Sequence, residues 1–350
     1  MRLSVTPLFL PLFFSFTSAA KLAPTAGFNG EVNLLTGYYR DTNNLSTNAS
    51  AYQDNITSKA KTNNELHDSM DGKGVFGLLG EVTYTFGEEL NYQLFLGTSR
   101  EEIATGSLAF ELGYKYELGD GTTVAISALP TLVSAEVWQD PYAVAEERQE
   151  TDLSGTAGRI KIDHIMGTGF GLDFGFGSSQ VDEDRAGFDA AYGSEDVASF
   201  DGDLLTDEEL ARLQRDRDYF SVKAQYLFYL PNKRGALLPS LTVVSSDADG
   251  EAQSYNSYKA ELTYVKVHNQ HSFALTLDGR YREYSEVNPL YGTLREDRQY
   301  GAFFVYEYAN VFGTQNWSLV TLTGANVIDS NIDYYDADFM FVSIGANYKF

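Results

Sequence analysis

The chain has 350 residues, a formal net charge of −24 and no cysteine. The lack of cysteine excludes disulfides and thiolate metal sites, and the excess of acid argues against nucleic-acid binding, which needs clustered Lys and Arg. Tyrosine (24), phenylalanine (23) and glycine (31) are abundant, a composition that suits aromatic belts and tight β-turns.

The N-terminus predicts a secretory signal peptide over residues 1–20. Arg2 precedes an apolar run over residues 3–16, and Ser18 and Ala20 follow at the small-residue positions that signal peptidase requires. The run is too short for a membrane-spanning helix. We therefore expect cleavage after Ala20 and one mature domain over residues 21–350.

Alternation of apolar and polar residues predicts about fourteen β-strands in the mature chain. Residues 107–118 alternate through six repeats without error. Three runs, residues 124–137, 237–244 and 317–324, alternate weakly, so twelve or sixteen strands stay open. Because side chains point to opposite faces in turn, each strand has one apolar and one polar face.

Short turns and long polar connections follow one another along the chain. Short turns are predicted near residues 87–89, 119–121, 167–169, 231–235, 269–270 and 310–315. Long connections are predicted at 41–71, 98–106, 139–152, 178–217, 246–253, 285–297 and 327–336. This asymmetry is typical of an all-β transmembrane antiparallel β-barrel with short periplasmic turns and long extracellular loops. A barrel of this size encloses too wide a lumen for side chains to fill, so the apolar face should point outward to lipid.

Aromatic residues collect at both ends of the predicted strands. One set lies beside the short turns, and includes Tyr84, Tyr114 and Tyr348. The other lies at the opposite ends, at Tyr38, Trp138, Phe220, Tyr258, Tyr281 and Tyr300. We interpret these sets as two belts at the headgroup levels of a membrane.

The last strand has an unbroken apolar face that ends on an aromatic residue. Its members are Met340, Val342, Ile344, Ala346, Tyr348 and Phe350. With the signal peptide, the Gly-Phe-Asn-Gly-Glu-Val opening (residues 27–32) and the final Asn-Tyr-Lys-Phe (residues 347–350), the chain resembles a Gram-negative outer-membrane barrel. It is most similar to a porin-like family catalogued as a domain of unknown function. The resemblance implies residence in the outer membrane and an assembly signal at Ala346, Tyr348 and Phe350, read by the barrel-assembly machinery. It implies no functional residues.

The polar faces of the strands supply the candidate pore residues. The acids are Glu81, Glu111, Glu117, Asp163, Asp173, Glu261, Asp278 and Glu307, and the bases are Lys115, Arg159, Lys161, Lys223, Lys259, Arg280 and Arg282. Such groups are tolerated inside a barrel only with water or partners around them. Two interpretations stay open: a field across the pore that orients solutes, and a salt-bridged network that stiffens the wall.

The negative charge lies mainly in the long connections. Residues 178–217 hold twelve acids and four arginines. They are either a solvated, repulsive surface or a loose divalent site shared with lipopolysaccharide. Residues 247–250 look like the start of a calcium loop, but Tyr258 stands where the bidentate Glu should be, which excludes an EF-hand.

Two further features of the chain concern what lies inside or above the barrel. A capping box from Thr206 to Glu209, followed by Leu210 and Leu213, predicts a short helix near residues 207–215. This helix would either narrow the barrel mouth or pack on the other loops. Small residues at Gly171, Gly175 and Gly177 thin the wall and would suit an inserted loop.

The four histidines give little support to catalysis. His164 shares an outward face in the predicted strand 156–166, but Met166 stands where an outer-membrane phospholipase would have its serine. The pair Asp163 and His164 abuts a short turn, whereas outer-membrane proteases work at the other rim. His67, His268 and His271 offer too few ligands for zinc. We expect no enzyme, no cofactor and no metal.

The sequence therefore predicts a passive outer-membrane channel for small hydrophilic solutes or ions, with an acidic mouth and mild cation selectivity at low salt. The alternative is a closed barrel that displays loops for binding or adhesion. A barrel enzyme is less favoured. Expected partners are outer-membrane lipid, lipopolysaccharide, the assembly machinery and small solutes, and the uniform outward faces favour a monomer.

Overall fold

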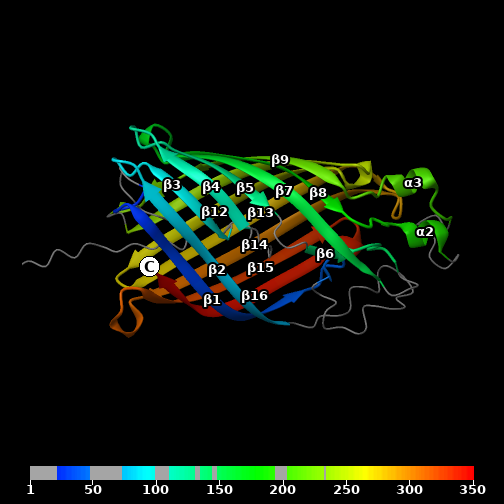
Figure 1. The fold of residues 1–350 in the computed structure, drawn as a ribbon. Helices are drawn as coiled ribbons and strands as arrows, with labels where there is room; N and C mark the ends of the chain where they lie inside the picture. The colour runs from blue at the N-terminus through cyan, green and yellow to red at the C-terminus, as the bar shows by residue number, and fades with distance from the viewer. Residues whose placement is uncertain are drawn as a thin grey trace, which may run out of the picture.

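The computed structural model describes residues 22–47, 73–98, 110–130, 135–143, 148–193, 203–231 and 234–350. The predicted signal peptide lies outside the described residues. The described strands form one antiparallel sheet that closes on itself (Figure 1). The first strand, β1 (Gly27–Asp41), pairs with β2 (Lys73–Phe86) on one side and with the last strand, β16 (Ala337–Lys349), on the other.

The remaining strands follow in chain order around the barrel. They are β3 (Tyr92–Thr98), β4 (Phe110–Glu117), β5 (Thr123–Pro130), β6 (Ala135–Trp138), β7 (Glu150–Asp163), β8 (Phe170–Val181), β9 (Arg217–Tyr226), β10 (Phe228–Tyr229), β11 (Gly235–Ala248), β12 (Tyr255–His268), β13 (His271–Asn288), β14 (Thr293–Ala309) and β15 (Trp317–Ser330). Both β5 and β6 pair with β7, and both β9 and β10 pair with β11, so each of these pairs makes one interrupted strand. The sixteen segments are therefore fourteen strands, which confirms the prediction, and the described parts of the three weakly alternating runs lie in β5 and β6, in β11 and in β15.

The two ends of the barrel differ in their connections. At one end, here the turn end, connections are short: only Asn269 and Gln270 separate β12 from β13, and Asn269 takes a positive φ of 56° that such tight turns require. The longest connections lie at the other end, the loop end, and carry the described α-helices (Figure 1). No helix among the described residues is long and apolar enough to cross a bilayer.

Strand boundaries at the loop end differ from the prediction. The connection predicted at residues 285–297 is only four residues long, because β13 runs to Asn288 and β14 begins at Thr293. Beyond a membrane both strand faces meet water, so the alternation is lost while the backbone pairing continues. At the turn end the strand predicted to reach Met166 stops at Asp163, and His164 has a left-handed φ of 54°.

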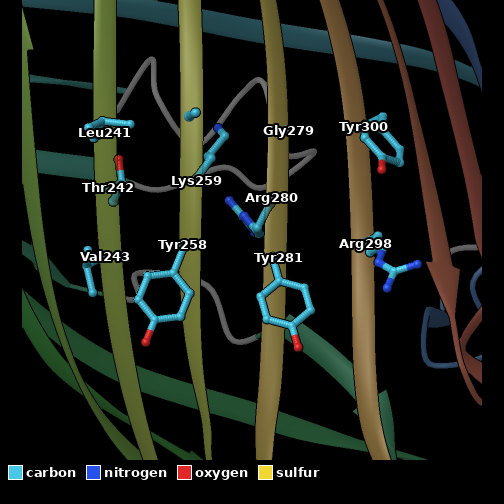
Figure 2. Close-up of a pocket in the computed structure, with 11 residues that line it drawn as sticks. Leu241, Thr242, Val243, Tyr258, Lys259, Gly279, Arg280, Tyr281, Arg298 and Tyr300 are labelled. Atoms are coloured by element: carbon cyan, nitrogen blue, oxygen red, sulfur yellow. The ribbon is translucent and has the colours of Figure 1, made fainter.

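The outer face of the barrel is apolar, as predicted. On β16, Met340, Val342 and Ile344 are 47%, 48% and 56% exposed, although they are large hydrophobic residues. At the turn end an aromatic belt forms through successive ring contacts, such as Trp317 with Tyr348 at 4.9 Å and Tyr348 with Phe350 at 6.3 Å. A fourteen-stranded barrel with this outer face has the architecture of outer-membrane barrels. The outer face is hollowed across β11 to β14 (Figure 2).

Part of the inner face is apolar, unlike the polar lining expected from alternation alone. Leu35, Leu79, Val265, Val305 and Leu322 are each buried and belong to one cluster on neighbouring strands. Their side chains pack sideways against one another along the wall. The charged side chains are consequently concentrated elsewhere on the inner face.

Candidate functional site: the charged inner wall and the loop cap

The fifteen candidate pore residues all lie on the strand face opposite the exposed apolar side chains. On β12, for example, Lys259 and Glu261 are partly buried, whereas Tyr258 and Leu262, at 46% and 45% exposed, point outward. The structure brings most of the fifteen into local clusters on the inner wall.

One cluster centres on Arg159 of β7. Its guanidinium forms a bidentate pair with Asp173 of β8 and lies 3.8 Å from the Glu111 carboxylate of β4. Ser127 donates to Glu111 at 2.5 Å. Nearby, Lys161 lies 3.7 Å from Asp163, which also accepts from Gln225 at 3.1 Å. These contacts connect five strands, β4, β5, β7, β8 and β9, and stiffen that side of the wall.

A second cluster centres on Glu261 of β12. Its oxygens lie 3.6 Å from Lys223 Nζ and 3.1 Å from Lys259 Nζ. The neighbouring Arg280 forms no ion pair with a described residue, and Arg282 lies 3.4 Å from Asp297. Cations therefore outnumber acids in this part of the wall.

At the turn end, Glu307 is almost completely buried, at 1% exposed. Its carboxylate accepts hydrogen bonds from Lys349 Nζ at 2.9 Å and from Ser318 Oγ at 2.6 Å. Lys349 and Asp297 are charged inner-wall residues that are not among the fifteen candidates. The alternation of the last strand carries the signal for Lys349, because it lies between the outward Tyr348 and Phe350.

The three glycines predicted to leave room for a loop are covered by neighbouring side chains. A Cβ on Gly175 would meet Ser221 Oγ at 2.5 Å, and one on Gly177 would meet Tyr219 Oη at 2.6 Å. A Cβ on Gly171 would meet Asp163 Oδ1 at 2.8 Å. Among the described residues, side chains of β7 and β9 therefore lie against these glycines, and the inserted loop stays a prediction.

Strand register arranges the charges in oblique rows. Lys161, Asp173, Lys223, Lys259 and Arg280 occupy one inward row, in which Thr242 stands between Lys223 and Lys259. The next inward row toward the turn end holds acids, where Glu261 pairs with Asp278. Basic and acidic side chains therefore form adjacent bands instead of a random mixture.

The two halves of the wall also differ in net charge. The comparison counts the described inward side chains of the strands, without Asp41, Arg217 and Arg295, which lie at the loop end. Strands β7 to β13 carry six inward cations and four acids, whereas β14 to β16 with β1 to β5 carry two cations and six acids. The first set is Arg159, Lys161, Lys223, Lys259, Arg280 and Arg282 with Asp163, Asp173, Glu261 and Asp278; the second is Lys115 and Lys349 with Glu31, Glu81, Glu111, Glu117, Asp297 and Glu307. Facing walls of opposite sign create a field across the lumen.

Above this wall, connections from opposite sides of the barrel meet. Tyr142, between β6 and β7, shares a hydrogen bond of 2.8 Å with Tyr335, between β15 and β16. Gln253, between β11 and β12, donates to Tyr142 at 3.2 Å, and Asn288 at the end of β13 donates to Tyr335 at 2.9 Å. The hairpins of Tyr142 and Tyr335 stand nearly half the circumference apart. Their contact therefore has to cross the mouth of the barrel.

These connections form a folded unit, here called the loop cap (residues 41–47, 139–143, 148, 184–193, 203–217, 249–254, 288–292 and 331–336). It has its own apolar core, composed of Tyr142, Ala186, Ala190, Ala191, Leu205, Leu213, Leu290, Ile332, Tyr334 and Tyr335. Apolar burial of this kind is the main source of stability in a folded unit. The sequence reading, which treated these stretches as solvated acidic loops, missed it.

Two short helices contribute to the cap. The predicted capping box is present: Thr206 accepts from the Glu209 N–H, and the Glu209 carboxylate accepts from the Thr206 N–H at 2.9 Å. The helix α3 (Asp207–Ala211) is shorter than predicted, and Leu213 beyond it is fully buried in the cap core. A second helix, α2 (Phe188–Tyr192), was not predicted.

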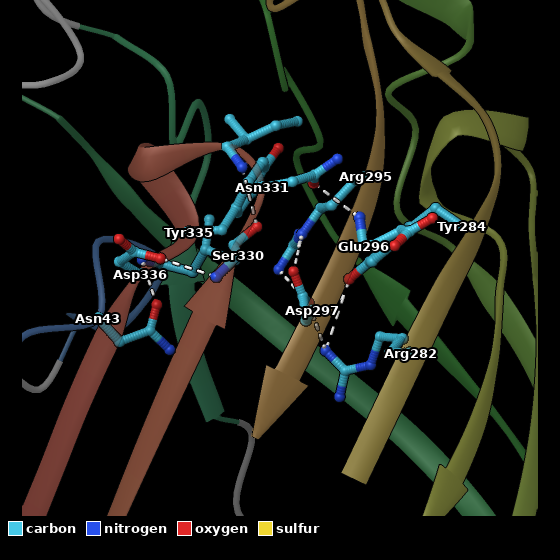
Figure 3. A network of polar contacts seen from close by, with 12 residues as sticks. Asn43, Arg282, Tyr284, Arg295, Glu296, Asp297, Ser330, Asn331, Tyr335 and Asp336 are labelled. Carbon is cyan, nitrogen blue, oxygen red and sulfur yellow. Dashed lines mark hydrogen bonds and ion pairs between the residues drawn. The ribbon is translucent and has the colours of Figure 1, made fainter. Parts of the chain in front are cut away.

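A polar frame anchors the cap to the barrel rim (Figure 3). The Arg295 guanidinium lies 3.4 Å from the centroid of the Tyr335 ring and 4.5 Å from that of Tyr284. It donates two hydrogen bonds of 2.8 Å to Asp297, which also meets Arg282. A planar guanidinium can stack on aromatic rings and at the same time form a bidentate pair with a carboxylate. Arg295 makes both kinds of contact and so holds Tyr335 over the mouth.

On the far rim, Arg148 and Asp140 play similar parts. Arg148 lies 4.2 Å from the Trp138 ring and donates to the Asn44 carbonyl at 2.8 Å. Trp138 is only 3% exposed, so its predicted place in the outer aromatic belt is wrong, because the cap folds over it. Asp140 accepts from the backbone N–H groups of Tyr142, Gly187 and Asp189 at 2.9–3.0 Å. Burial nevertheless raises the pKa of Asp140 above its ordinary value.

The described histidines lie at the turn end, and His268 and His271 form local hydrogen bonds there. His271 shares a hydrogen bond of 2.8 Å with Tyr306, and His268 lies 3.4 Å from the Asn269 amide. His164 sits in the turn beside the exposed Met166. His67 lies outside the described residues. No group of three or more Asp, Glu or His side chains suited to a metal occurs in the described part of the chain. Residues 247–248, which resemble the start of a calcium loop, belong to the strand β11.

A family model described as "Protein of unknown function (DUF2860)" matches residues 27–349. The chain belongs to this family. Among proteins with curated descriptions, none matches the DUF2860 chain.

Several solved structures are similar to this DUF2860 protein. A loop L8 deletion mutant of OmpT, an outer-membrane protein of Vibrio cholerae, is 12% identical, with 93% of this chain and 100% of that chain covered and a TM-score of 0.40. The outer-membrane channel DcaP of Acinetobacter baumannii is 10% identical, with 95% and 100% covered and a TM-score of 0.42. An anion-selective porin from Comamonas acidovorans is 8% identical, with 93% and 99% covered and a TM-score of 0.40.

Proposed function

We propose that this protein is a passive channel of a Gram-negative outer membrane for small hydrophilic solutes and ions. The turn end would face the periplasm and the loop cap the exterior. The observation that carries the proposal is the inner wall, where two halves of opposite net charge face one another beneath an apolar outer face. Buried charges are costly unless water or partners surround them, and a transverse field is useful only to solutes that pass through it.

The loop cap gives the channel its restriction. Because contacts between opposite hairpins cross the mouth, solutes would pass beside the cap or during its opening. The acid-rich sequence of residues 178–217 would raise the local cation concentration at the exterior. Mild cation selectivity that weakens at high salt is therefore part of the proposal.

Planar-bilayer recording of the refolded full chain tests the proposal. Discrete conductance steps, with a reversal potential that favours cations at low salt, are the expected result. Correctly folded protein that inserts but never conducts above background would contradict it.

A closed barrel that displays a binding surface is the second candidate, and the packing of the cap across the mouth favours it. Replacing Tyr335 with Ala, to loosen the cap, separates the two candidates. A channel restricted by its cap should then conduct more, whereas a permanently closed barrel should stay silent. The engaged histidines and the missing serine at Met166 favour neither candidate enzyme, so we propose no catalytic role.

The proposed partners follow from the same orientation. The outer face would contact outer-membrane lipid and lipopolysaccharide. Tyr348 and Phe350, 37% and 50% exposed on that face, would with Ala346 form the signal for the assembly machinery. Phe350 is already part of the sheet, since its N–H and carbonyl both bond to Gly30 at 3.0 Å.

A further inference from the structure

The outer face is hollowed across β11 to β14 (Figure 2). Ala260 and Gly279, which are register partners, form the floor of the hollow, and Leu241 and Tyr300 flank them in the same outward row. A Cβ on Gly279 would meet only the Tyr300 ring, at 4.0 Å. The hollow has a volume of about 450 Å³, within the range of about 300–1,000 Å³ that ligand pockets span.

The next outward row toward the loop end is amphipathic. It contains Tyr258, Tyr281 and Arg298, again as register partners, and Figure 2 shows them side by side. The Tyr258 hydroxyl donates to Glu283 at 3.3 Å, and the Tyr281 hydroxyl bonds to Glu296. Arg298 is exposed and forms no ion pair with a described residue, although the exposed Asp329 of β15 is its register partner. An apolar hollow therefore ends in two tyrosines and an exposed guanidinium, with Glu283, Glu296 and Asp329 beside them.

We propose that the hollow binds one acyl chain of lipid A, with a lipid A phosphate on the Arg298 guanidinium. Tyrosines of this kind mark the headgroup level of a membrane, and the row lies in the loop half of the wall, which faces the outer leaflet. A guanidinium matches phosphate in charge and geometry. The inference rests on the proposed function only in requiring the outer face to contact the outer leaflet.

Two substitutions test the two parts of the site. Gly279→Leu fills the hollow without a backbone clash, and Arg298→Gln removes the cation while keeping the polar length. The full chain is refolded in detergent and titrated with purified bis-phosphorylated lipid A, and the bound lipid is counted by native mass spectrometry. Each substitution should weaken lipid A binding by about ten-fold or more, the loss expected for one charge-assisted contact or a filled pocket.

Matched controls lie elsewhere on the outer wall. Gly74→Leu adds the same side chain to β2, where a Cβ meets nothing within 4 Å, and Arg40→Gln removes an outward arginine near Tyr38 on β1. Both should leave lipid A binding unchanged. Lipid A stripped of its phosphates should bind wild type as weakly as lipid A binds Arg298→Gln.

Three results would overturn the inference. The first is equal lipid A binding by wild type, Gly279→Leu and Arg298→Gln, and the second is equal binding of phosphatidylglycerol and lipid A by wild type. The third is loss of a dimer in Gly279→Leu, which would assign the hollow to a second copy. Bilayer conductance of the same preparations keeps the two proposals apart. If Gly279→Leu and Arg298→Gln conduct normally but lose lipid A binding, the lipid site is supported. If the wild type does not conduct but still binds lipid A, only the channel proposal is contradicted.

Discussion

The barrel wall and the loop cap follow different rules, although one chain builds both. The wall is a repeating structure in which alternation assigns each side chain to lipid or lumen. The cap is held by contacts between residues far apart in the sequence, such as Tyr142 with Tyr335 and Arg148 with Asn44. The wall can therefore be read from local pattern, whereas the cap depends on which loops the closed barrel brings together.

The largest expected effect separates the stability of the cap from that of the wall. Tyr335→Ala removes a buried ring that contacts Arg295, Tyr142 and Asn288, so the cap should lose about 3–5 kcal/mol. Trp138 fluorescence reports on the cap in a Trp317→Phe background, because these are the two tryptophans of the chain. Its urea midpoint should fall while the heat-dependent gel migration of the barrel stays unchanged.

The exposed Tyr84 offers a control for that experiment, since Tyr84→Ala changes only the outer belt at the turn end and should leave the Trp138 transition in place. A Tyr335→Ala protein whose barrel unfolds together with its cap would show that the two regions are one cooperative unit.

A substitution in the inner wall should destabilise the barrel and leave the packing of the cap unchanged. Asp173→Asn removes the charge that forms the bidentate pair with the largely buried Arg159 guanidinium, and loss of one partner of a buried ion pair costs about 3 kcal/mol. The barrel should unfold at lower urea in lipid vesicles, with the Trp138 signal of the cap unaffected until the barrel itself melts.

The exposed, outward Asp218 of β9 serves as the matched site, and Asp218→Asn should have no effect on barrel unfolding. If Asp173→Asn is equally silent, water rather than the ion pair solvates Arg159, and the wall is less rigid than the contacts indicate.

A smaller effect should appear in the pH dependence of the cap. The pKa of Asp140 is raised from 3.8 by burial, so the folded cap binds a proton that the unfolded cap has released. Cap stability should therefore be higher below 3.8 and fall as pH rises through the raised pKa, then stay level. Urea midpoints of the Trp138 signal across acidic pH measure this.

Asp140→Asn should remove the contribution of Asp140 to that profile, because the amide does not titrate, and should leave the contribution of Asp41, whose pKa burial also raises. A wild-type profile that rises with pH would mean that the three N–H donors outweigh burial and depress the pKa.

Much of the wall was predictable from sequence. The strand number, the outward apolar face and the inward placement of Lys259 and Glu261 all follow from period-two alternation. The pairing partners of each strand do not follow from the alternation, because register depends on the neighbouring strand. Only the register shows that Lys223, Lys259 and Arg280 lie in one band. The local capping box at Thr206 was likewise readable, whereas the burial of Trp138 and Leu213 depends on distant loops.

The most direct test of a charged, water-filled lumen uses the lack of cysteine in the chain. Arg280→Cys introduces a single thiol into the basic band of the inner wall, and bilayer current is recorded before and after a charged, membrane-impermeant thiol reagent. Modification should change the current, with a cationic reagent restoring the wild-type ion preference and an anionic reagent increasing cation preference. A thiol that reacts only after denaturation, with no effect on current, would contradict an aqueous pore at this position.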